Sequence, residues 1–206
     1  MKDKGIRTRE RVLAGATELF HRQGFSGTSI QDLIRETGVK KGNLYHYFSS
    51  KEEMGLQVLS SARDDFSRFL ENSLQGDTPS ARLANHFAAI VRYHENRNLV
   101  GGCIFGNTAL EMSDRNDTYR DVIHSVFEEW RRRIREVLEN AVRSGEVRKD
   151  LDPDAMARHI VATVEGGILL ARASRNPADL KECLAVLAGL LGIGDATGAH
   201  RKDNPA

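Results

Sequence analysis

The sequence predicts an all-α protein with a small N-terminal domain and a larger C-terminal domain. Apolar residues recur at intervals of three and four along most of the chain, which is the spacing of a buried helix face. No stretch alternates apolar and polar residues as a half-buried strand does, and no internal repeat is present. Glycine follows several of the apolar stretches and proline precedes the last two, as is typical of helix ends and helix starts.

Charge is divided unevenly along the 206 residues, although the net charge of the whole chain is only +1. Residues 1–51 contain ten Lys and Arg against five Asp and Glu, a balance of +5, so the remainder carries −4. A basic small domain ahead of a mildly acidic larger one is typical of a nucleic-acid reader joined to a domain that does not contact nucleic acid. The 40% of hydrophobic residues is enough for a core in each domain.

Several classes of protein are disfavoured by simple features of the chain. Two cysteines, Cys103 and Cys183, do not suggest a disulfide framework. No apolar run approaches the roughly 18 residues of a membrane span, and the charged N-terminus lacks the apolar segment of a signal peptide. We therefore expect a cytoplasmic protein with no membrane partner.

The first long helix is predicted from Thr8 to Gln23. Its buried stripe consists of Val12, Ala16, Leu19 and Phe20. Gly24 ends it, and Phe25 is expected to fold back against it. The basic residues before Thr8 are interpreted as a flexible arm beside DNA phosphates, or simply as a solvated tail.

Residues 28–48 predict two short helices separated by a tight turn. Thr28 or Ser29 can cap the first helix, and Gly38 can end it in the left-handed conformation. The second helix, Lys41 to Phe48, places Leu44 and Phe48 on its buried face. The opposite face carries basic, amide and aromatic side chains, namely Lys41, Asn43, Tyr45 and Tyr47, with His46 at the side.

This layout is that of a helix-turn-helix whose second helix enters the DNA major groove. Asn and Lys can hydrogen-bond base edges, tyrosine hydroxyls can contact phosphates, and Gly42 allows the backbone to approach DNA. A core helix hairpin is the plain alternative, but no acidic residue occurs between Gly38 and Lys51. We expect DNA contacts from Thr28, Ser29, Gln31, Lys41, Gly42, Asn43, Tyr45, His46, Tyr47 and Lys51.

A third signal follows at the start of the next helix, which is predicted to run from Lys51 to near Leu74. Ser49 and Ser50 are its candidate caps. A cation such as Lys51 is disfavoured by the dipole at a helix N-terminus, and a nearby phosphate would explain its presence. This helix begins in the first domain and ends in the second.

The string GFSGTSIQDLIRETGVKKGNLYHYFSSKEEM resembles the N-terminal domain of TetR-family transcriptional regulators. The matching pairs are Gly24–Phe25, Thr28–Ser29, Gly38–Val39, Lys41–Gly42, Leu44–Tyr45, Tyr47–Phe48 and Lys51–Glu52. The resemblance covers about the first quarter of the chain, and it implies that Lys51 contacts the DNA backbone. Lys40 departs from the family, which has serine there, and Asn43 departs from its Thr or Ser. Both differences leave the operator sequence open.

The rest of the chain predicts helices only. They span 81–96, 103–112, 119–144, a segment from about Pro153 to Arg175 and one from Pro177 to about Leu191. The last two are too broadly apolar for one buried face, and Gly166 and Gly167 would permit close helix approach. An ordinary core is one interpretation. A homodimer interface built as a four-helix bundle is the other, and the family resemblance favours it.

The resemblance also implies a small-molecule effector site among the middle helices. Its candidate residues combine apolar walls and polar anchors: Phe87, Tyr93, His94, Cys103, Phe105, Asn107, Glu111, His124, Phe127, Trp130 and Glu165. Cys103 follows two glycines at a predicted helix start, where the dipole favours a reactive thiolate. In some members of the family a cysteine near this point is modified by electrophiles or oxidants. The alternative is a cysteine that packs as a small apolar residue.

These features predict a dimeric regulator, most simply a repressor released from a palindromic DNA operator by an effector or by thiol modification. An activator or adaptor of the same fold is an alternative. A helical enzyme using Glu111, His124 and Glu165 is another, although no nucleophile–base spacing or cofactor motif supports it. We predict no enzyme activity, no cofactor and no metal, since His86 and His94 lack further ligands at zinc-site spacing.

We divide the chain into a helix-turn-helix DNA-binding domain over residues 1–51 and a helical ligand-binding and dimerisation domain over residues 52–191. Residues 192–206 are predicted to be a disordered tail.

Overall fold

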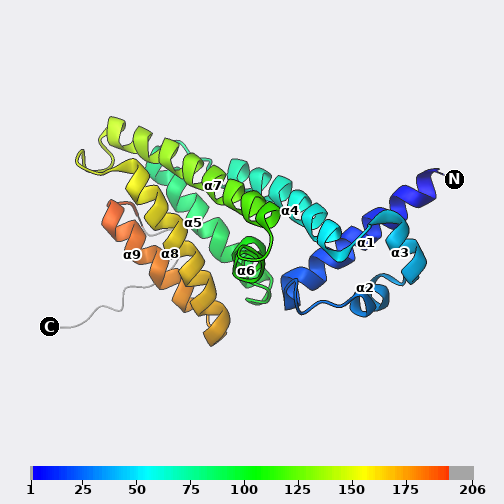
Figure 1. The fold of residues 1–206 in the computed structure, drawn as a ribbon. Helices are drawn as coiled ribbons and strands as arrows, with labels where there is room; N and C mark the ends of the chain where they lie inside the picture. Colours follow the sequence, from blue (N-terminus) through cyan, green and yellow to red (C-terminus); the bar gives the residue numbers. More distant parts are fainter. Residues whose placement is uncertain (1, 195–206) are drawn as a thin grey trace. The chain divides into compact units, whose positions relative to one another are not determined.

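The computed structural model describes residues 2–194, with side chains from Gly5 onward. Over these residues it has nine α-helices and no strand, so the predicted all-α class is confirmed (Figure 1). The helices are α1 (Lys2–Gln23), α2 (Ile30–Thr37), α3 (Lys41–Tyr47), α4 (Lys51–Ser73), α5 (Pro79–Asn96), α6 (Ile104–Met112), α7 (Asp117–Ser144), α8 (Pro153–Ser174) and α9 (Ala178–Leu191).

The described residues form two compact units, and helices α4 and α7 each contribute a segment to both. The first unit comprises residues 2–67 and 101–126, and the second comprises residues 68–100 and 127–194. The predicted domain boundary at residue 51 stays a prediction. Helix α4 begins at Lys51 and continues without a break from the first unit into the second.

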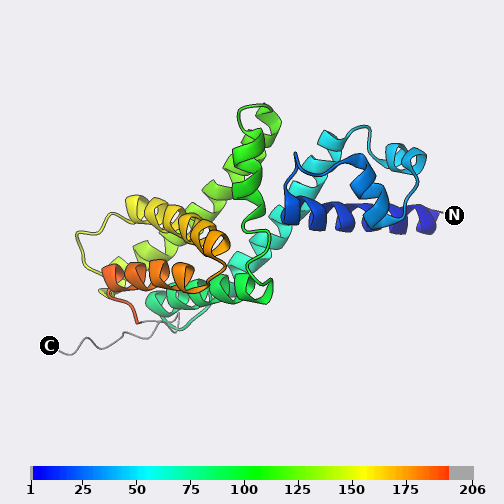
Figure 2. The same ribbon diagram turned by 90° about the horizontal axis from the view of Figure 1, so that it is seen from below.

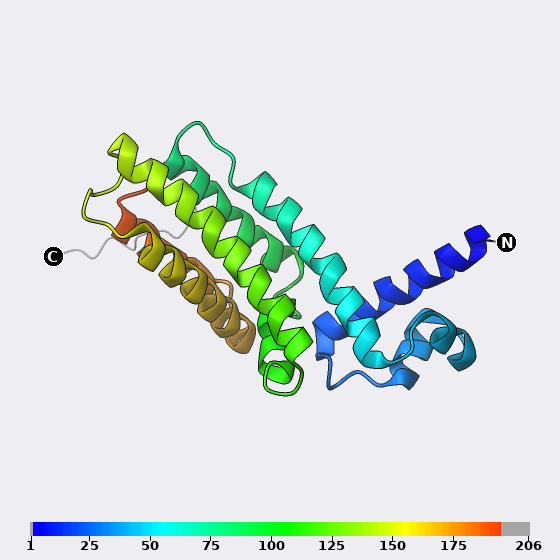
Figure 3. The same cartoon turned by 45° about the horizontal axis from the view of Figure 1, so that its top comes forward.

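In the first unit, α1 packs on α2 and α6, and α2 packs on α3 (Figure 3). The core of this unit is formed by side chains spaced three and four apart on each helix. Its fully buried members include Val12, Ala16, Leu33, Leu44, Met54 and Tyr119. Tyr119 is the first large residue of α7, so the beginning of that helix belongs to the same core as α1 to α3.

In the second unit, α8 and α9 form a hairpin whose two helices lie side by side, and α5 packs on α9 (Figure 2). Arg175, in the left-handed conformation with φ 58°, ends α8 and begins the short connection. Gly167 permits the close approach of the two helices, because a Cβ there would lie 2.9 Å from Leu180 Cδ1. The buried face of this unit includes Leu83, Phe87, Ile134, Leu138, Ile160, Val164 and Leu184.

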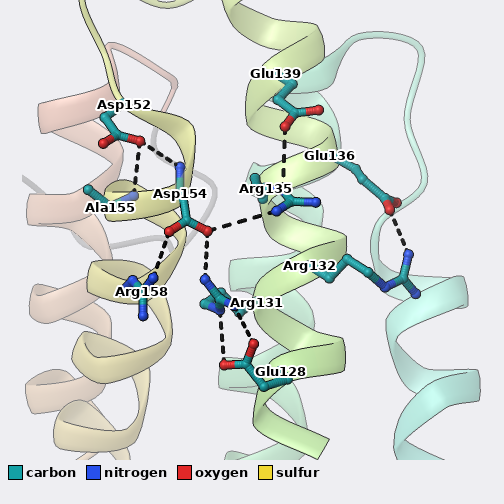
Figure 4. Close-up of polar contacts among 10 residues, drawn as sticks. All are labelled: Glu128, Arg131, Arg132, Arg135, Glu136, Glu139, Asp152, Asp154, Ala155 and Arg158. Atoms are coloured by element: carbon teal, nitrogen blue, oxygen red, sulfur yellow. Dashed lines mark hydrogen bonds and ion pairs between the residues drawn. The ribbon is translucent and has the colours of Figure 1, made fainter. Parts of the chain in front are cut away.

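An ion-pair network joins α7 to the first turn of α8 in the second unit (Figure 4). Asp154 accepts hydrogen bonds from Arg131 at 2.6 Å and from Arg158 at 2.8 Å. Hydrogen bonding from Arg158 is the main cause that lowers the pKa of the Asp154 carboxyl. Asp152 caps the same turn by accepting from the backbone N–H groups of Asp154 and Ala155.

The predicted start of the first helix at Thr8 was wrong, because α1 already begins at Lys2. Residues 2–7 contain no proline, and lysine and arginine are good helix formers. A helix nucleated at the buried stripe therefore extends through residues 2–7. Once a nucleus exists, each added residue gains a hydrogen bond, so extension costs little free energy. The flexible arm predicted for this segment is replaced by helical turns.

Two other helices, α5 and α7, begin nearer the N-terminus than predicted. Thr78 caps α5 by accepting from the N–H of Ala81, and Asn116 accepts from the N–H of Tyr119 in the first turn of α7. In each case a polar side chain in the loop satisfies a free backbone donor. The start of α6 moved the other way, because Cys103 was predicted as its first residue and is instead its N-cap.

The prediction that the disordered tail begins at residue 192 was wrong for its first two residues, Gly192 and Ile193. Gly192 ends α9 in the left-handed conformation with φ 69°, and Ile193 is buried with 7% of its surface exposed. An apolar residue directly after the glycine cap commonly packs back on the helix it follows. Residues 195–206 lie outside the described part of the chain, so the prediction for them stays open.

Candidate nucleic-acid interface and effector residues

The start of α2 is held by a reciprocal capping box. The Ser29 hydroxyl accepts from the backbone N–H of Asp32 at 3.1 Å, and the Asp32 carboxylate accepts from the backbone N–H of Ser29 at 2.9 Å. The hydrogen bonds from Ser29 lower the pKa of the Asp32 carboxyl. Of the two predicted caps, Ser29 is therefore the one used. Thr28 is buried, and its hydroxyl donates to the carbonyl oxygen of Gly24 at 2.7 Å.

The turn between α2 and α3 follows the predicted pattern. Gly38 ends α2 with φ 65°, a conformation that glycine adopts without steric cost. Val39 is buried, and Lys40 occupies the N-cap of α3 without a side-chain cap hydrogen bond. The two helices are thus separated by three residues, as in a helix-turn-helix.

Helix α3 has one buried face and one exposed face. Leu44 and Phe48 anchor it, with 0% and 1% of their surface exposed. Of the predicted DNA contacts, Lys41, Asn43, Tyr45 and His46 are exposed, together with Ser29 and Gln31 at the start of α2 and the backbone at Gly42, whereas Thr28 is buried. Tyr47 is half-buried, since its hydroxyl oxygen lies 3.6 Å from the position that a Cβ on Gly5 of α1 would take.

Lys51 begins α4, and its Nζ lies 4.3 Å from the centroid of the Phe25 ring. Burial lowers the pKa of this ammonium group, while the nearby carboxylates of Glu52 and Glu111 oppose that shift. The Phe25 ring packs edge-on against Tyr119 at a centroid distance of 5.4 Å. The cation therefore rests on a rigid aromatic surface and is presented at the helix start.

In the first unit the effector candidates have identifiable local partners. Cys103 is half-buried, and its Sγ accepts from the backbone N–H of Gly106 at 3.4 Å. Phe105 is buried against Phe66, and the side-chain amide of Asn107 donates to the carbonyl oxygen of Gly101. Glu111 accepts a hydrogen bond from the backbone N–H of Ser26. His124 is exposed.

In the second unit Phe87, His94 and Trp130 are buried, Phe127 and Glu165 are half-buried, and Tyr93 is 45% exposed. Because the effector candidates divide between the two units, the set as a whole stays a prediction. The sequence analysis did not predict that His86 is a hydrogen-bond partner of Trp130. The Trp130 indole N–H donates to Nε2 of His86 at 3.0 Å, and the other ring nitrogen of His86 lies 2.7 Å from the Ser73 hydroxyl.

These two hydrogen bonds define which nitrogen of the His86 ring carries the proton. Because Nε2 accepts from Trp130, the ring proton is on Nδ1 and is donated to Ser73. Complete burial lowers the pKa of His86 to about 3, so the ring is neutral. A histidine three residues after Leu83 in an apolar stripe was the available signal in the sequence, but its partners lie on other helices.

The α8–α9 hairpin carries an apolar surface that the described residues 2–194 leave uncovered. Leu169 and Leu170 on α8, with Val186 and Leu190 on α9, are each more than half exposed. Gly166 is exposed and has open space around it, whereas Gly167 is buried in the contact between the two helices. Only the first of these two adjacent glycines therefore lies on the outer surface.

None of the described helices combines the length and the apolar character needed to cross a membrane. Over the same residues, no group of three or more His, Cys, Asp or Glu side chains is arranged to hold a metal ion.

The fold and the exposed face of α3 define a helix-turn-helix DNA-binding protein. Residues 12–58 match the family model described as "Bacterial regulatory proteins, tetR family", and residues 79–187 match "Tetracyclin repressor-like, C-terminal domain". The chain therefore belongs to the TetR family of transcriptional regulators, which bind DNA and are not enzymes.

Individual relatives agree with this assignment. The chain is 32% identical over 181 residues to the HTH-type transcriptional repressor DhaR of Mycobacterium sp. (strain GP1), covering 87% of this chain and 89% of that protein. A TetR transcriptional regulator from Chloroflexus aurantiacus has a similar crystal structure, with a TM-score of 0.85, 35% identity and coverage of 93% of this chain and 97% of that one. The reduced form of E. coli NemR superposes with a TM-score of 0.78 at 25% identity, covering 92% and 98%.

Proposed function

We propose that this protein is a homodimeric transcriptional repressor that leaves a palindromic operator when an effector binds or when Cys103 is modified. The proposal is supported mainly by the exposed face of α3, which carries no acidic residue and lies opposite the buried side chains of Leu44 and Phe48. The related DhaR is named a transcriptional repressor, which supports repression over activation.

The DNA-contacting residues divide by role. Asn43 is assigned to base edges, because an amide can pair with a base in the major groove. Lys41, Tyr45 and Lys51 are assigned to phosphates, which position the protein without reading sequence. Exposure of Lys41, Asn43 and Tyr45 and the aromatic support beneath Lys51 are consistent with these roles.

The dimer is assigned to the outer surface of α8 and α9. An apolar patch formed by four large side chains on adjacent helices is typical of a surface that is covered by a partner. A two-fold symmetric dimer would place two α3 helices about one DNA turn, or a multiple, apart on a palindrome. We also propose that the protein works in the cytoplasm, because the DNA operator that it would bind is there.

Release by thiol modification is assigned to Cys103. Its Sγ caps the N-terminus of α6, where the helix dipole favours the thiolate. The segment that it caps contains Glu111, which contacts the α1–α2 turn of the DNA-binding unit. The structure of the related NemR is described as a reduced form, and this description of a relative is consistent with redox control here.

The test is binding to duplex DNA from upstream of the protein's own gene, with and without a thiol-reactive electrophile. Serine at position 103 keeps a capping oxygen but cannot be alkylated, so Cys103→Ser is expected to bind DNA and to resist the electrophile. The matched control is Cys183→Ser, because Cys183 is also half-buried but lies in α9. Loss of the response in Cys183→Ser alone would reject Cys103 as the sensor.

A reversible small-molecule effector is the second route of release. A tenfold change in operator occupancy requires the effector to prefer the released state by about 1.4 kcal/mol. If the electrophile does not change DNA binding by the wild type, release by a reversible small-molecule effector becomes the working assignment. Absence of DNA binding to any duplex would contradict the repressor assignment itself.

A further inference from the structure

The carboxylate of Glu111, on α6, lies directly on the turn that connects α1 to α2. Its Oε2 accepts from the backbone N–H of Ser26 at 2.5 Å. Its Oε1 lies so close to Gly24 that a Cβ on that residue would be 2.3 Å away. Gly24 also has φ 83°, which disfavours any side chain there. The turn is thus shaped to receive a carboxylate.

The Ser26 amide is a donor that the turn does not use internally. Other backbone groups of the same turn are paired locally, since the N–H of Gly24 donates to Phe20 and the N–H of Thr28 donates to Phe25. Ser29, one residue further, is the N-cap of α2. A contact that orders Ser26 therefore orders the segment that leads into α2, and α3 packs on α2.

A second contact from the same segment holds the end of α1. The His21 ring nitrogen Nε2 lies 2.7 Å from the carbonyl oxygen of Gly102. Gly101, with φ 88°, approaches so closely that an added Cβ would lie 2.8 Å from the His21 ring and from its carbonyl oxygen. Residues 101–111 therefore contact α1 and the turn after it at two points.

We propose that Glu111 is a positioning residue for operator binding, acting through the Ser26 amide on the α1–α2 turn. The carboxylate contacts neither DNA nor effector in this assignment. It orders the turn in the free protein, so that α2 and α3 are already placed when DNA arrives. Without it, binding must also order the turn, and only the ordered fraction of the protein binds. This proposal rests on the DNA-binding assignment, not on release by Cys103.

The experiment compares operator affinity for Glu111→Ala and Glu111→Gln, using a duplex that the wild-type protein selects from random DNA. Glutamine keeps an oxygen that can accept from Ser26, whereas alanine does not. Glu111→Ala is expected to bind about tenfold more weakly, the loss that corresponds to one strong hydrogen bond. Glu111→Gln is expected to recover most of that affinity.

Two further readouts separate positioning from charge and from general stability. The Ser26 amide should exchange its hydrogen faster in Glu111→Ala than in the wild type, and at a near wild-type rate in Glu111→Gln, as measured by NMR. The salt dependence of DNA binding should keep the same slope in all variants, because no phosphate contact is removed. Asp114→Ala, which removes an exposed carboxylate from the loop after α6, is the matched control and should bind as the wild type does.

The results of these binding experiments distinguish failure of the positioning role from failure of the DNA-binding assignment. If wild type and Glu111→Ala bind the selected duplex equally while both are folded, the positioning role is rejected and the repressor assignment stands. Tighter binding by both Glu111 variants would mean that the carboxylate merely repels DNA, which also rejects it. If the wild type selects no duplex at all, the DNA-binding assignment fails and the proposal fails with it.

Discussion

Tyr119, at the start of α7, donates a hydrogen bond from its hydroxyl to the backbone carbonyl oxygen of Glu52 in the first turn of α4, at 2.8 Å. The two residues are 67 positions apart in the sequence. Tyr119 is fully buried, and burial raises the pKa of its phenol, so the hydroxyl stays protonated and remains a donor. The turn that begins with Lys51 is therefore attached to the start of α7.

Replacement of Tyr119 by phenylalanine should remove this hydrogen bond without leaving a large cavity. We expect a loss of about 1 kcal/mol in the free energy of unfolding, the usual contribution of one such bond. Alanine should cost about 3–5 kcal/mol, because it also empties the space of the ring. Chemical denaturation of the two variants beside the wild type measures both values. Equal losses for phenylalanine and alanine would contradict the role given to the ring.

Gly55 provides a second test of the same contact. A Cβ at this position would lie 1.9 Å from the Tyr119 hydroxyl oxygen and 2.8 Å from the Phe25 ring. Gly55→Ala should therefore destabilise the protein by about 1–3 kcal/mol, although alanine is normally the better helix former. In a Tyr119→Phe background the cost should be smaller, since the nearest clashing atom is gone. Strict additivity of the two changes in denaturation experiments would argue against this packing.

His86 should make stability depend on acid pH. The folded ring has a pKa of about 3, whereas histidine in an unfolded chain titrates near pH 6.5. Between these values the unfolded state binds the extra proton, so the stability provided by the neutral ring is complete above pH 6.5 and falls as the pH decreases. The free energy of unfolding should drop by about 1.4 kcal/mol per pH unit from this group.

The measurement is the pH dependence of unfolding followed by Trp130 fluorescence, with His86→Gln as comparison. Glutamine can accept from Trp130 and donate to Ser73, yet it does not titrate. The stability difference between wild type and His86→Gln should shift by about 3 kcal/mol in favour of glutamine between pH 7 and pH 4. A difference that stays constant over this range would show that His86 is not the titrating group.

The proposed DNA contacts on α3 and at the start of α4 should separate into two kinds by their effect on DNA binding. Lys41→Ala, Tyr45→Ala and Lys51→Ala should weaken binding to all sequences, and each lysine change should reduce the salt slope by about one. Asn43→Ala should instead lose about 1–3 kcal/mol of discrimination at one base position. Binding titrations at several salt concentrations, on matched and mismatched duplexes, distinguish them.

Lys149→Ala serves as the control for these changes, because Lys149 is exposed but lies in the second unit. Wild-type affinity for Lys41→Ala combined with Tyr45→Ala would remove the assignment of DNA reading to α3.

A charged residue introduced on the outer surface of α8 and α9 should weaken the dimer. Leu170→Glu and Val186→Glu place a carboxylate in a surface that we assign to the dimer contact, and these side chains are 54% and 63% exposed in the single chain. Each should raise the dimer dissociation constant at least about tenfold, because a buried unpaired charge is costly. Analytical ultracentrifugation measures this constant. Leu110→Glu, on α6 and 85% exposed, is the matched change that should leave the dimer intact.

Much of the DNA-binding unit could be predicted from local signals in the sequence. Ser29 and Gly38 delimit α2 because caps act within one turn of a helix, and Leu44 and Phe48 share a face because of the helical repeat. The same reasoning misplaced the start of α1 at Thr8. No local stop signal precedes that residue, and a helix stabilised further along its length extends as far as its residues allow.

Only the tertiary structure decided which distant residues meet. The hydrogen bonds from Ser26 to Glu111, from Tyr119 to Glu52 and from Trp130 to His86 each join residues more than 40 positions apart. Capping preferences and periodicity act within a few residues, so they place a side chain on a helix face but not its partner on another helix. Those partners follow from how the helices pack, and here the packing includes residues 101–126 in the same compact unit as the DNA-reading helix.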